Sequence, residues 1–421
     1  MLDRLILRHF FDGLAIGGAL AEWALACWVL AGLGAEPPAL LHVTVPPLLA
    51  VANRLAARTL AREPRAGRLA QRTAYGALAT AFAALVGAGV LVVVAGVWAS
   101  IDLLALRAEA GALAPPGGQP LFSAGFRFLA TGMIALAGAA VAYGYAHGYR
   151  RLVVTEVTVP VTGLPPPLGG LRVVHVSDLH VGPLADRAAL RQAIDRVAAL
   201  DPDVVCVTGD IVDSPATNLD AWGPELGRLT ARHGVFAVLG NHDLHAGTER
   251  VVAALARWTR WRLLRDEVAT LVVGGAPLHL VGLEERPDGA VRDDLSGLLA
   301  RVPAGEPAIL LAHRPAVFPA AAAARVPLTL SGHTHGGQVA VPGAPRINVA
   351  RLLITRFDAG VFERDGAVLY VSRGLGTSGQ RVRIGVPSEI TVVTLVPRER
   401  AEHPALTPRL AGVATTSEGQ H

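Results

Sequence analysis

Two histidines on alternate residues, His333 and His335, lie in the segment LSGHTHGGQ at residues 330–338. The apolar run before them, residues 326–330, is typical of a buried strand, and the neighbouring glycines indicate a turn at its end. On such a turn the two imidazoles can reach two adjacent metal ions. A single His-x-His pair is incidental about as often as it is a metal site, so its meaning depends on the residues that precede it.

Four earlier segments also end an apolar run with Asp, His or Asn. They are Ser177-Asp178-Leu179-His180, Gly209-Asp210-Ile211-Val212-Asp213, Gly240-Asn241-His242-Asp243 and His313-Arg314-Pro315. These side chains suit Mn, Fe or Zn ions rather than a thiolate site. Together with the two histidines they could fill two metal sites that share one carboxylate. A metal pair about 3.5–4 Å apart can generate a hydroxide and hold phosphoryl oxygens during in-line displacement, while an imidazole that is not a ligand protonates the leaving oxygen.

The elements that must position these residues alternate along the chain after residue 151. Apolar runs predict strands at 171–176, 204–208, 235–239, 278–283, 308–312 and 328–331, and helical patterns cover 186–200, 219–232, 248–258, 290–301 and 316–325. This alternation predicts α/β layers. In such folds ligands bind beyond the carboxyl ends of the strands, where the polar residues lie.

The five blocks, in this order, resemble the calcineurin-like metallophosphoesterase superfamily over about residues 171–396. The resemblance implies a four-layer α/β/β/α sandwich and a metal-dependent phosphoesterase. It implies that Asp178, His180 and His335 hold one divalent metal ion, that Asn241, His313 and His333 hold a second, and that Asp210 bridges them. It also implies that His242 is the catalytic acid, oriented by Asp213, and that Asp243 supports the loop.

Two further segments, Gly332–Gln338 and Tyr370–Gly376, resemble the bacterial membrane-associated branch of this superfamily. Members of that branch include cell-envelope phosphoesterases and a UDP-diacylglucosamine pyrophosphate hydrolase. Arg314 and Arg373 could contact a phosphate, or could equally be surface cations. His175 and His245 match no ligand position and are expected to be structural.

The first third of the chain is apolar enough to enter a membrane. Four stretches, at roughly 13–34, 37–57, 74–99 and 126–147, reach the length of about 20 residues that a membrane-spanning helix needs. The first contains Glu22, which is costly in lipid unless it faces other helices. The second, with Pro46 and Pro47, is the weakest. Ala-rich helices buried in a soluble domain are the alternative, which four nearly uncharged stretches in succession make the poorer account.

The distribution of arginine predicts the orientation. Six arginines lie from the end of the second stretch to the start of the third: Arg54, Arg58, Arg62, Arg65, Arg68 and Arg72. Others precede the first stretch and follow the fourth. The positive-inside rule then places both termini and the catalytic domain in the cytoplasm of a multi-pass cell-membrane protein. If the second stretch does not cross, the count becomes three and the catalytic domain faces outward.

Composition narrows the functional class further. The 421 residues are 52% hydrophobic and 17% charged, as is typical of membrane proteins. The net charge of +4 arises within residues 1–150, which hold 11 Arg and 7 acids. The rest of the chain is balanced, so no nucleic-acid partner is expected. The two cysteines, Cys27 and Cys206, have no partner at a useful spacing and imply neither a disulfide framework nor a thiolate zinc site.

These observations predict three regions: a transmembrane region at 1–150, a metallophosphoesterase domain at 151–397, and a tail at 398–421 without regular structure. The expected function is cleavage of a phosphodiester or pyrophosphate bond, in a lipid-linked or cell-envelope substrate. Two alternatives stay open. One is a tethered phosphomonoesterase or nucleotide phosphodiesterase. The other is a metal-binding membrane scaffold or sensor without turnover, which the intact pair of His242 and Asp213 argues against.

Overall fold

The computed structural model describes residues 2–33, 35–61, 68–108, 124–183, 185–215, 217–286, 295–398 and 409–414. The chain divides into two compact units, Met1–Tyr143 and Gly144–His421. The division falls inside the last predicted apolar stretch rather than after it. The end of this stretch packs on the second unit: a Cβ at Gly144 would lie 2.7 Å from Val382 and 2.8 Å from Ile384, both of which belong to that unit.

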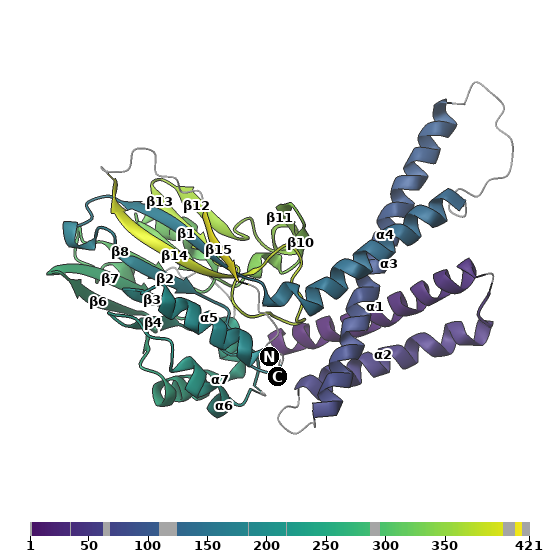
Figure 1. Ribbon diagram of the computed structural model, residues 1–421, viewed down its shortest axis with the longest axis horizontal. Coiled ribbons are helices and arrows are strands. Elements are labelled where there is room, and N and C mark those ends of the chain that lie inside the picture. Colours follow the sequence, from purple (N-terminus) through teal and green to yellow (C-terminus); the bar gives the residue numbers. More distant parts are fainter. Residues whose placement is uncertain are drawn as a thin grey trace. The chain divides into compact units, whose positions relative to one another are not determined.

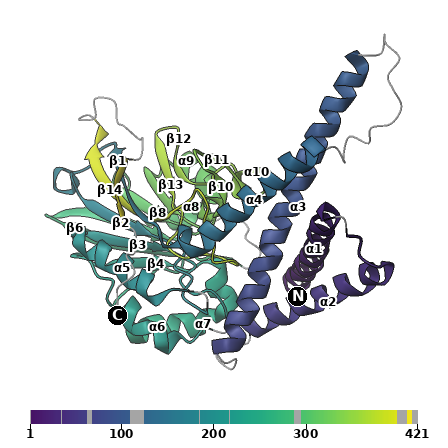
Figure 2. The ribbon, with the colours of Figure 1, turned by 45° about the vertical axis from the view of Figure 1, so that its right-hand side comes forward.

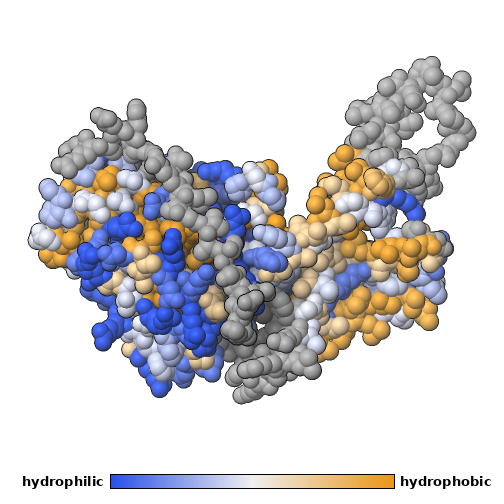
Figure 3. All heavy atoms as spheres, viewed as in Figure 1, coloured by the Kyte–Doolittle hydropathy of each residue, from blue (hydrophilic) through white to orange (hydrophobic). Residues whose placement is uncertain are grey.

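The first unit consists of long helices: α1 (Leu2–Gly32), α2 (Ala39–Ala61), α3 (Arg68–Ala108) and α4 (Ala124–Ala146), the last of which ends in the second unit (Figure 1). In the described residues, three segments are long and apolar enough to cross a membrane: Ala39–Thr59, Gly76–Val97 and Gly125–Arg150. The apolar part of α1, Ala15–Ala31, is shorter. The predicted count of four spans is thus approximate, and the second stretch meets the criterion despite its prolines. Hydrophobic side chains cover much of the surface of these helices (Figure 3).

The one acid inside the apolar part of α1 faces the neighbouring helices. The Glu22 carboxylate accepts a hydrogen bond from Asn53 Nδ2 on α2 at 3.2 Å and another from Thr80 Oγ1 on α3 at 3.3 Å. Asn53 is buried, with 3% of its surface exposed. A charged group in an apolar setting is tolerated when such partners surround it. Glu22 therefore meets the condition that the sequence analysis set for it.

The second unit contains two packed sheets (Figures 1 and 2). The seven-stranded sheet has the order β15-β1-β14-β2-β3-β4-β5. Its strands are β1 (Leu152–Val161), β2 (Arg172–Val176), β3 (Val204–Thr208), β4 (Val235–Val238), β5 (Arg262–Leu263), β14 (Ser388–Pro397) and β15 (Arg409–Ala414). The six-stranded sheet has the order β12-β13-β9-β8-β7-β6, from β6 (Glu267–Val273), β7 (Ala276–Gly282), β8 (Ala308–Leu311), β9 (Leu328–Ser331), β12 (Gly360–Arg364) and β13 (Ala367–Val371).

Helices cover the outer face of each sheet. The helices α5 (Arg187–Ala199), α6 (Leu219–Leu226) and α7 (Asn241–Trp258) pack on the seven-stranded sheet, and α8 (Leu295–Leu299) and α9 (Phe318–Ala323) lie on the other. Successive residues of a strand point to opposite faces, so Val173 enters the core between the sheets while Val174 packs against the helices. Strands buried on both faces are continuous apolar runs. The structure confirms the predicted four-layer α/β/β/α architecture.

The C-terminal tail differs from the expectation. Residues 409–414, predicted to lack regular structure, form β15, which pairs antiparallel with β1. Without it, β1 would be an edge strand whose free backbone groups favour pairing with another strand. The other tail residues, 399–408 and 415–421, lie outside the described part of the chain, so the predicted bounds of the three regions stay a prediction.

Candidate metal centre

The predicted ligands come from five loops at the carboxyl ends of strands. Those in the seven-stranded sheet follow β2 (Asp178 and His180), β3 (Asp210) and β4 (Asn241), and those in the other sheet follow β8 (His313) and β9 (His333 and His335). The strands β2, β3 and β4 run parallel, as do β8 and β9. Carboxyl ends of parallel strands open on the same edge of a sheet, so both sheets deliver their polar loops to one place.

The structure brings all seven side chains together. Potential ligand atoms lie within 4.8 Å of one another in each of three groups: Asp178, His180 and His335; His180, Asp210 and His242; and Asp210, His313 and His333. Asp210 Oδ2 lies 3.6 Å from His180 Nε2 and 3.3 Å from His313 Nε2. Asp210 thus lies between the two sets of side chains that the sequence analysis assigned to separate ions.

The donor atoms converge in a way that fits metal ions. His180 Nε2 lies 3.0 Å from His335 Nε2, and His335 Nε2 lies 3.4 Å from Asp178 Oδ1. In the second set, His313 Nε2 lies 3.1 Å from Asn241 Oδ1 and 3.2 Å from His333 Nδ1. Imidazole nitrogens and carboxylate oxygens that face one another in a buried site are a suitable donor set for Mn, Fe or Zn. The residues present therefore fit such ions.

Unusual backbone geometry aims these side chains. Ten non-glycine residues in the described part of the chain have a positive φ, and five of them belong to the predicted ligand set: Asp178, His180, Asp210, His333 and His335. A left-handed conformation costs a non-glycine residue of the order of 1–3 kcal/mol, and such residues concentrate at functional sites. Packing of the surrounding layers must therefore hold these loops in place.

Close approach between loops explains two of the motif glycines. A Cβ at Gly332 would clash with Ser177 Oγ and Asp178 Oδ2, and one at Gly240 would clash with Asp210 Oδ1. The same tight contact lets the backbone N–H of His333 donate to Asp178 Oδ1 at 3.0 Å. Because Gly332 and Gly240 have no Cβ, their loops can pack directly against the carboxylates of Asp178 and Asp210.

The electrostatics of the site depend on its two buried carboxylates. Burial raises the pKa of Asp178, and the negative charge of Asp210 raises it further, beyond the lowering by His313 and His180. Burial acts in the same direction on Asp210, but His313 and His180 outweigh it and hold the pKa of Asp210 well below its usual range. The site thus keeps negative charge in a place shielded from water, and a cation there is correspondingly stabilised.

The histidines respond in opposite directions. Burial opposes the charged form of His313, yet the adjacent Asp210 raises its pKa to about 10. Burial and the charge of His313 together lower the pKa of His333 to about 3. Burial, followed by the charge of His180, lowers the pKa of His335 well below its usual range. Neutral imidazoles are the form that binds metal, so His333 and His335 are already in that form, whereas His313 must release a proton to bind an ion.

His242 lies at the edge of the cluster and is held differently from its neighbours. Its backbone N–H donates to Asp210 Oδ1 at 2.8 Å, and its Nδ1 lies 2.8 Å from the carbonyl oxygen of Asp213. The Asp213 carboxylate is 3.9 Å from His242 Nδ1 but only 3.3 Å from His180 Nδ1. His242 thus contacts Asp213, and the nearer group is the carbonyl rather than the carboxylate.

Asp243 supports the loops, as expected. Its buried carboxylate accepts hydrogen bonds from the backbone N–H groups of Gly240 at 2.8 Å, Val212 at 2.8 Å and Ile211 at 3.2 Å. It thereby joins the loop after β3 to the start of α7. Bonds of this kind satisfy amides at the helix N-terminus that have no partner within the helix.

The sequence analysis assigned no role to two polar residues near His242. Ser378 Oγ lies 3.5 Å from His242 Nε2. Gln338 fixes the backbone of Ser378 through two hydrogen bonds: Ser378 N–H donates to Gln338 Oε1 at 2.6 Å, and Gln338 Nε2 donates to the Ser378 carbonyl at 3.0 Å. Gln338 ends the glycine-rich motif at residues 330–338, so its position in the sequence could have marked it as a site residue. Ser378 follows 40 residues later without any pattern that marks it.

The other candidates have structural partners. Arg373 forms an ion pair with the fully buried Glu389 at 2.5 Å, and Arg314 Nε donates to Glu285 at 2.7 Å. His175 is buried and contacts Thr208 Oγ1 at 2.8 Å, in agreement with its expected structural role. His245 is exposed on α7. These contacts favour structural roles for Arg373 and His175.

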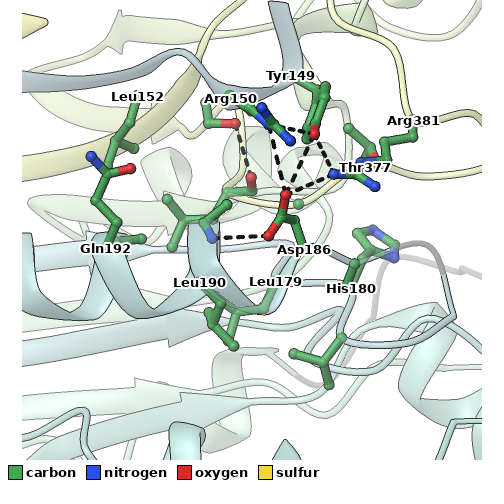
Figure 4. A pocket seen from close by; sticks show the side chains of 17 residues that line it. Tyr149, Arg150, Leu152, Leu179, His180, Asp186, Leu190, Gln192, Thr377 and Arg381 are labelled. Atoms are coloured by element: carbon green, nitrogen blue, oxygen red, sulfur yellow. Dashed lines mark hydrogen bonds and ion pairs between the residues drawn. The ribbon is translucent and has the colours of Figure 1, made fainter. Parts of the chain in front are cut away.

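A pocket borders the loop that carries His180 (Figure 4). Leu179, Leu190 and other aliphatic residues form its apolar side. On the polar side, the Asp186 carboxylate accepts hydrogen bonds from Arg381 at 2.7 Å and Tyr149 at 3.4 Å, and Arg150 Nε lies 3.8 Å away. Arg150, which the sequence analysis used only as a topology signal, therefore lines a mixed apolar and cationic pocket beside the loop of the candidate ligand His180.

Comparison with known proteins identifies the family of the chain. Residues 171–337 match the family model described as calcineurin-like phosphoesterase. A 271-residue stretch is 31% identical to the uncharacterized metallophosphoesterase YkuE of Bacillus subtilis, covering 62% of this chain and 93% of that protein. The chain belongs to the calcineurin-like metallophosphoesterase family. This bacterial relative is consistent with the bacterial branch of the superfamily that the motifs predicted.

Two animal relatives are named as transmembrane proteins. The chain is 33% identical over 266 residues to a transmembrane protein with metallophosphoesterase domain from Bos taurus, covering 60% of this chain and 59% of that protein. The match to its counterpart in Danio rerio covers 64% of the relative, so the chain spans about three fifths of both proteins. Among solved structures, a dimetal phosphatase from Danio rerio shares 13% identity and a TM-score of 0.32 over 49% of this chain and 88% of that one.

Proposed function

We propose that the chain is a membrane-anchored, dinuclear metal-dependent phosphohydrolase that cleaves a phosphodiester or pyrophosphate bond. The observation that carries this proposal is the convergence of seven candidate ligands from five loops, six of them Asp and His side chains in close groups and the seventh Asn241, whose Oδ1 lies 3.1 Å from His313 Nε2. A further imidazole, His242, lies within ligand distance of His180 and Asp210, and in this proposal it serves as the proton donor rather than as a ligand. A purely structural metal site has no use for such a group.

The proposed ligands form two sets joined by one carboxylate. Asp178, His180 and His335 would hold one ion. Asn241, His313 and His333 would hold the other, and Asp210 would contact both. Their nitrogen and oxygen donors suit Mn, Fe or Zn. When bound, such a pair polarises phosphoryl oxygens and lowers the pKa of water.

His242 supplies the proton for the leaving oxygen. Its Nδ1 is occupied by the carbonyl of Asp213 at 2.8 Å, which fixes the ring and directs Nε2 to the other side. The side chain is 27% exposed, so a substrate can reach it, whereas His180 and His313 are almost fully buried. Donation of a proton by a group held in this way contributes about 10²–10⁴-fold to the rate.

The substrate in this proposal is lipid-linked or part of the cell envelope. The apolar helices tether the metal centre to a membrane, and the pocket beside Leu179 combines an apolar side with two arginines, which suits an amphiphilic phosphate ester. The positive-inside rule places the catalytic unit on the cytoplasmic side of the cell membrane. Protease protection in intact cells tests this: cleavage of the catalytic unit from outside would contradict it.

Hydrolysis by the purified full chain tests the activity. The metal is stripped and Mn²⁺ is restored, and an aryl phosphodiester and the matching monoester are offered. We expect diester cleavage that requires metal, is abolished in Asp210→Asn and falls about 10²–10⁴-fold in His242→Ala, with metal binding retained in the latter.

His233 provides a matched control: it precedes β4, at the end of the strand away from the candidate metal loops, so His233→Ala should keep full activity. Cleavage of the monoester alone would favour a tethered phosphomonoesterase. Metal binding without turnover of either compound would contradict the enzymatic proposal and favour a scaffold or sensor.

A further inference from the structure

Exposed aliphatic side chains concentrate in one short segment of the second unit. In its described residues six large hydrophobic side chains are exposed, and five of them form what we call the aliphatic patch: Val341, Ile347, Val349, Leu352 and Ile354. Leu352 is 70% exposed and Ile354 is 67% exposed. The strands and the helix that carry these side chains contact one another, and apolar side chains gathered in this way on a folded unit indicate an interaction site.

A well-built scaffold holds the patch in place. It consists of the hairpin β10 (Ala340–Val341) and β11 (Ala344–Asn348) and the short helix α10 (Val349–Leu353). The buried Asn348 caps α10 by accepting from Arg351 N–H at 2.8 Å, and it donates to Asp358 Oδ2 at 2.6 Å. The aliphatic side chains therefore face outward because the local structure directs them there.

The charge around the patch is positive. Arg346, Arg351 and Arg356 are exposed beside it. The single acid between residues 339 and 358 is Asp358, which is 2% exposed and bound by Arg351 at 2.9 Å. Arg346 and Arg356 lie over aromatic rings, at 5.9 Å from the centroid of Phe362 and 4.9 Å from that of Phe357. Two cationic groups are thus presented beside the patch, and Glu363, which lines the same pocket as Arg346, is an exposed acid on the neighbouring strand β12.

We propose that the aliphatic patch docks on the surface of a bilayer that contains anionic lipids. Aliphatic side chains would enter the boundary between headgroups and acyl chains while the arginines contact lipid phosphates, as in interfacial membrane-binding segments. The chain itself supplies the bilayer, since the span Gly125–Arg150 leads directly into the second unit. Protein interfaces are enriched in aromatic residues, and the patch exposes none.

The patch is built onto the metal-ligand loop. A Cβ at Gly337, two residues after His335, would lie 2.9 Å from Asn348 Oδ1 and 3.0 Å from Ala350 N, so the start of α10 packs directly on this loop. Docking therefore holds the metal centre at the height of the lipid headgroups. This consequence rests on the proposed function, and it narrows the substrate class to phosphate esters embedded in the bilayer.

Fluorescence from the full chain in lipid nanodiscs tests docking without measuring activity. Leu352→Cys, in a Cys27→Ser background, carries an environment-sensitive fluorophore, while Cys206 is buried and stays unlabelled. The nanodiscs contain phosphatidylglycerol and phosphatidylcholine with brominated acyl chains. Val272→Cys is the matched control, because Val272 is 60% exposed and lies outside the patch. We expect a blue shift and quenching by bromine at Leu352 and neither at Val272.

Charge variants separate lipid contact from other occupants. Arg346→Gln and Arg356→Gln should each weaken docking about fivefold in anionic nanodiscs, because one arginine near such a surface contributes about that factor. A blue shift without bromine quenching would show that the helices of this chain cover the patch, and a shift that grows with protein density would indicate a second copy. Either result, or equal signals at both labels, would overturn the proposal.

Activity then serves as a separate readout. If docking is real but the proposed function fails, the labels report bilayer contact and no substrate is cleaved. If only docking fails, soluble diesters are still hydrolysed and the labels stay in water.

Discussion

Gly332→Ala should damage the metal centre although it adds only one methyl group. The new Cβ would lie 2.9 Å from Ser177 Cβ and closer still to Ser177 Oγ and Asp178 Oδ2. Carbon atoms pack at about 3.5–4.0 Å, so the two loops must separate by at least about 0.6 Å. Asp178 is fully buried, and its carboxylate also accepts from His333 N–H at 3.0 Å, so it cannot move aside without losing that bond.

Two losses follow from this displacement. Forcing an extra carbon into a packed site costs about 1–3 kcal/mol of stability. Displacing the groups that orient metal ligands lowers metal affinity about 10–100-fold. Titration calorimetry with Mn²⁺ on the full chain measures the second effect, and thermal unfolding with and without metal measures the first.

Two variants make the reasoning refutable. Gly297→Ala adds the same methyl group where nothing lies within 4 Å, on the exposed side of α8, and should leave metal affinity unchanged. Ser177→Ala combined with Gly332→Ala removes the contact with the hydroxyl but not that with the carboxylate, so affinity should recover only in part. Unchanged affinity in Gly332→Ala, or full recovery in the double variant, would show that the contact with Asp178 does not hold the site.

Three further predictions concern buried polar groups, each measured by chemical unfolding followed by tryptophan fluorescence. Burial lowers the pKa of His175 to about 4 against an unfolded value near 6.5; the free energy of unfolding should therefore be highest above pH 6.5 and fall by up to about 3 kcal/mol towards pH 4, a slope that His175→Asn should lose. Glu389→Gln should cost about 3–5 kcal/mol, because Arg373 would lose its buried partner; a loss below about 1 kcal/mol would contradict this. Asp243→Ala should cost at least about 2–3 kcal/mol, because three backbone amides lose their acceptor; Asp243→Asn, which keeps one oxygen, should cost less.

The sequence predicted the layers and the site because both depend on local patterns. Apolar runs that end in Asp, His or Asn mark buried parallel strands, and their carboxyl ends must meet once the strands are parallel. The sequence did not predict where α7 begins. It begins at Asn241, whereas the helical pattern began at residue 248, because Gly247 has a φ of 103° and interrupts the helix beside the motif.

The sequence did not predict contacts between residues far apart in the chain. The pairing of β1 with β14 joins Leu152 to Ser388, and nothing local encodes it. The position of Ser378 beside His242 depends on the same kind of tertiary contact. That Asp213 contacts His242 through its carbonyl rather than its carboxylate depends on a side-chain rotamer, which the spacing of residues does not determine.

The metal content of purified variants tests the central claim most directly. Mass spectrometry of the full chain, loaded with Mn²⁺ and freed of excess metal, should give about two ions per chain for the wild type and for His242→Ala. His335→Ala and His333→Ala should each retain about one. A wild-type chain that binds no metal, or a His242→Ala chain that loses it while the other two variants keep it, would contradict the assignment of these side chains.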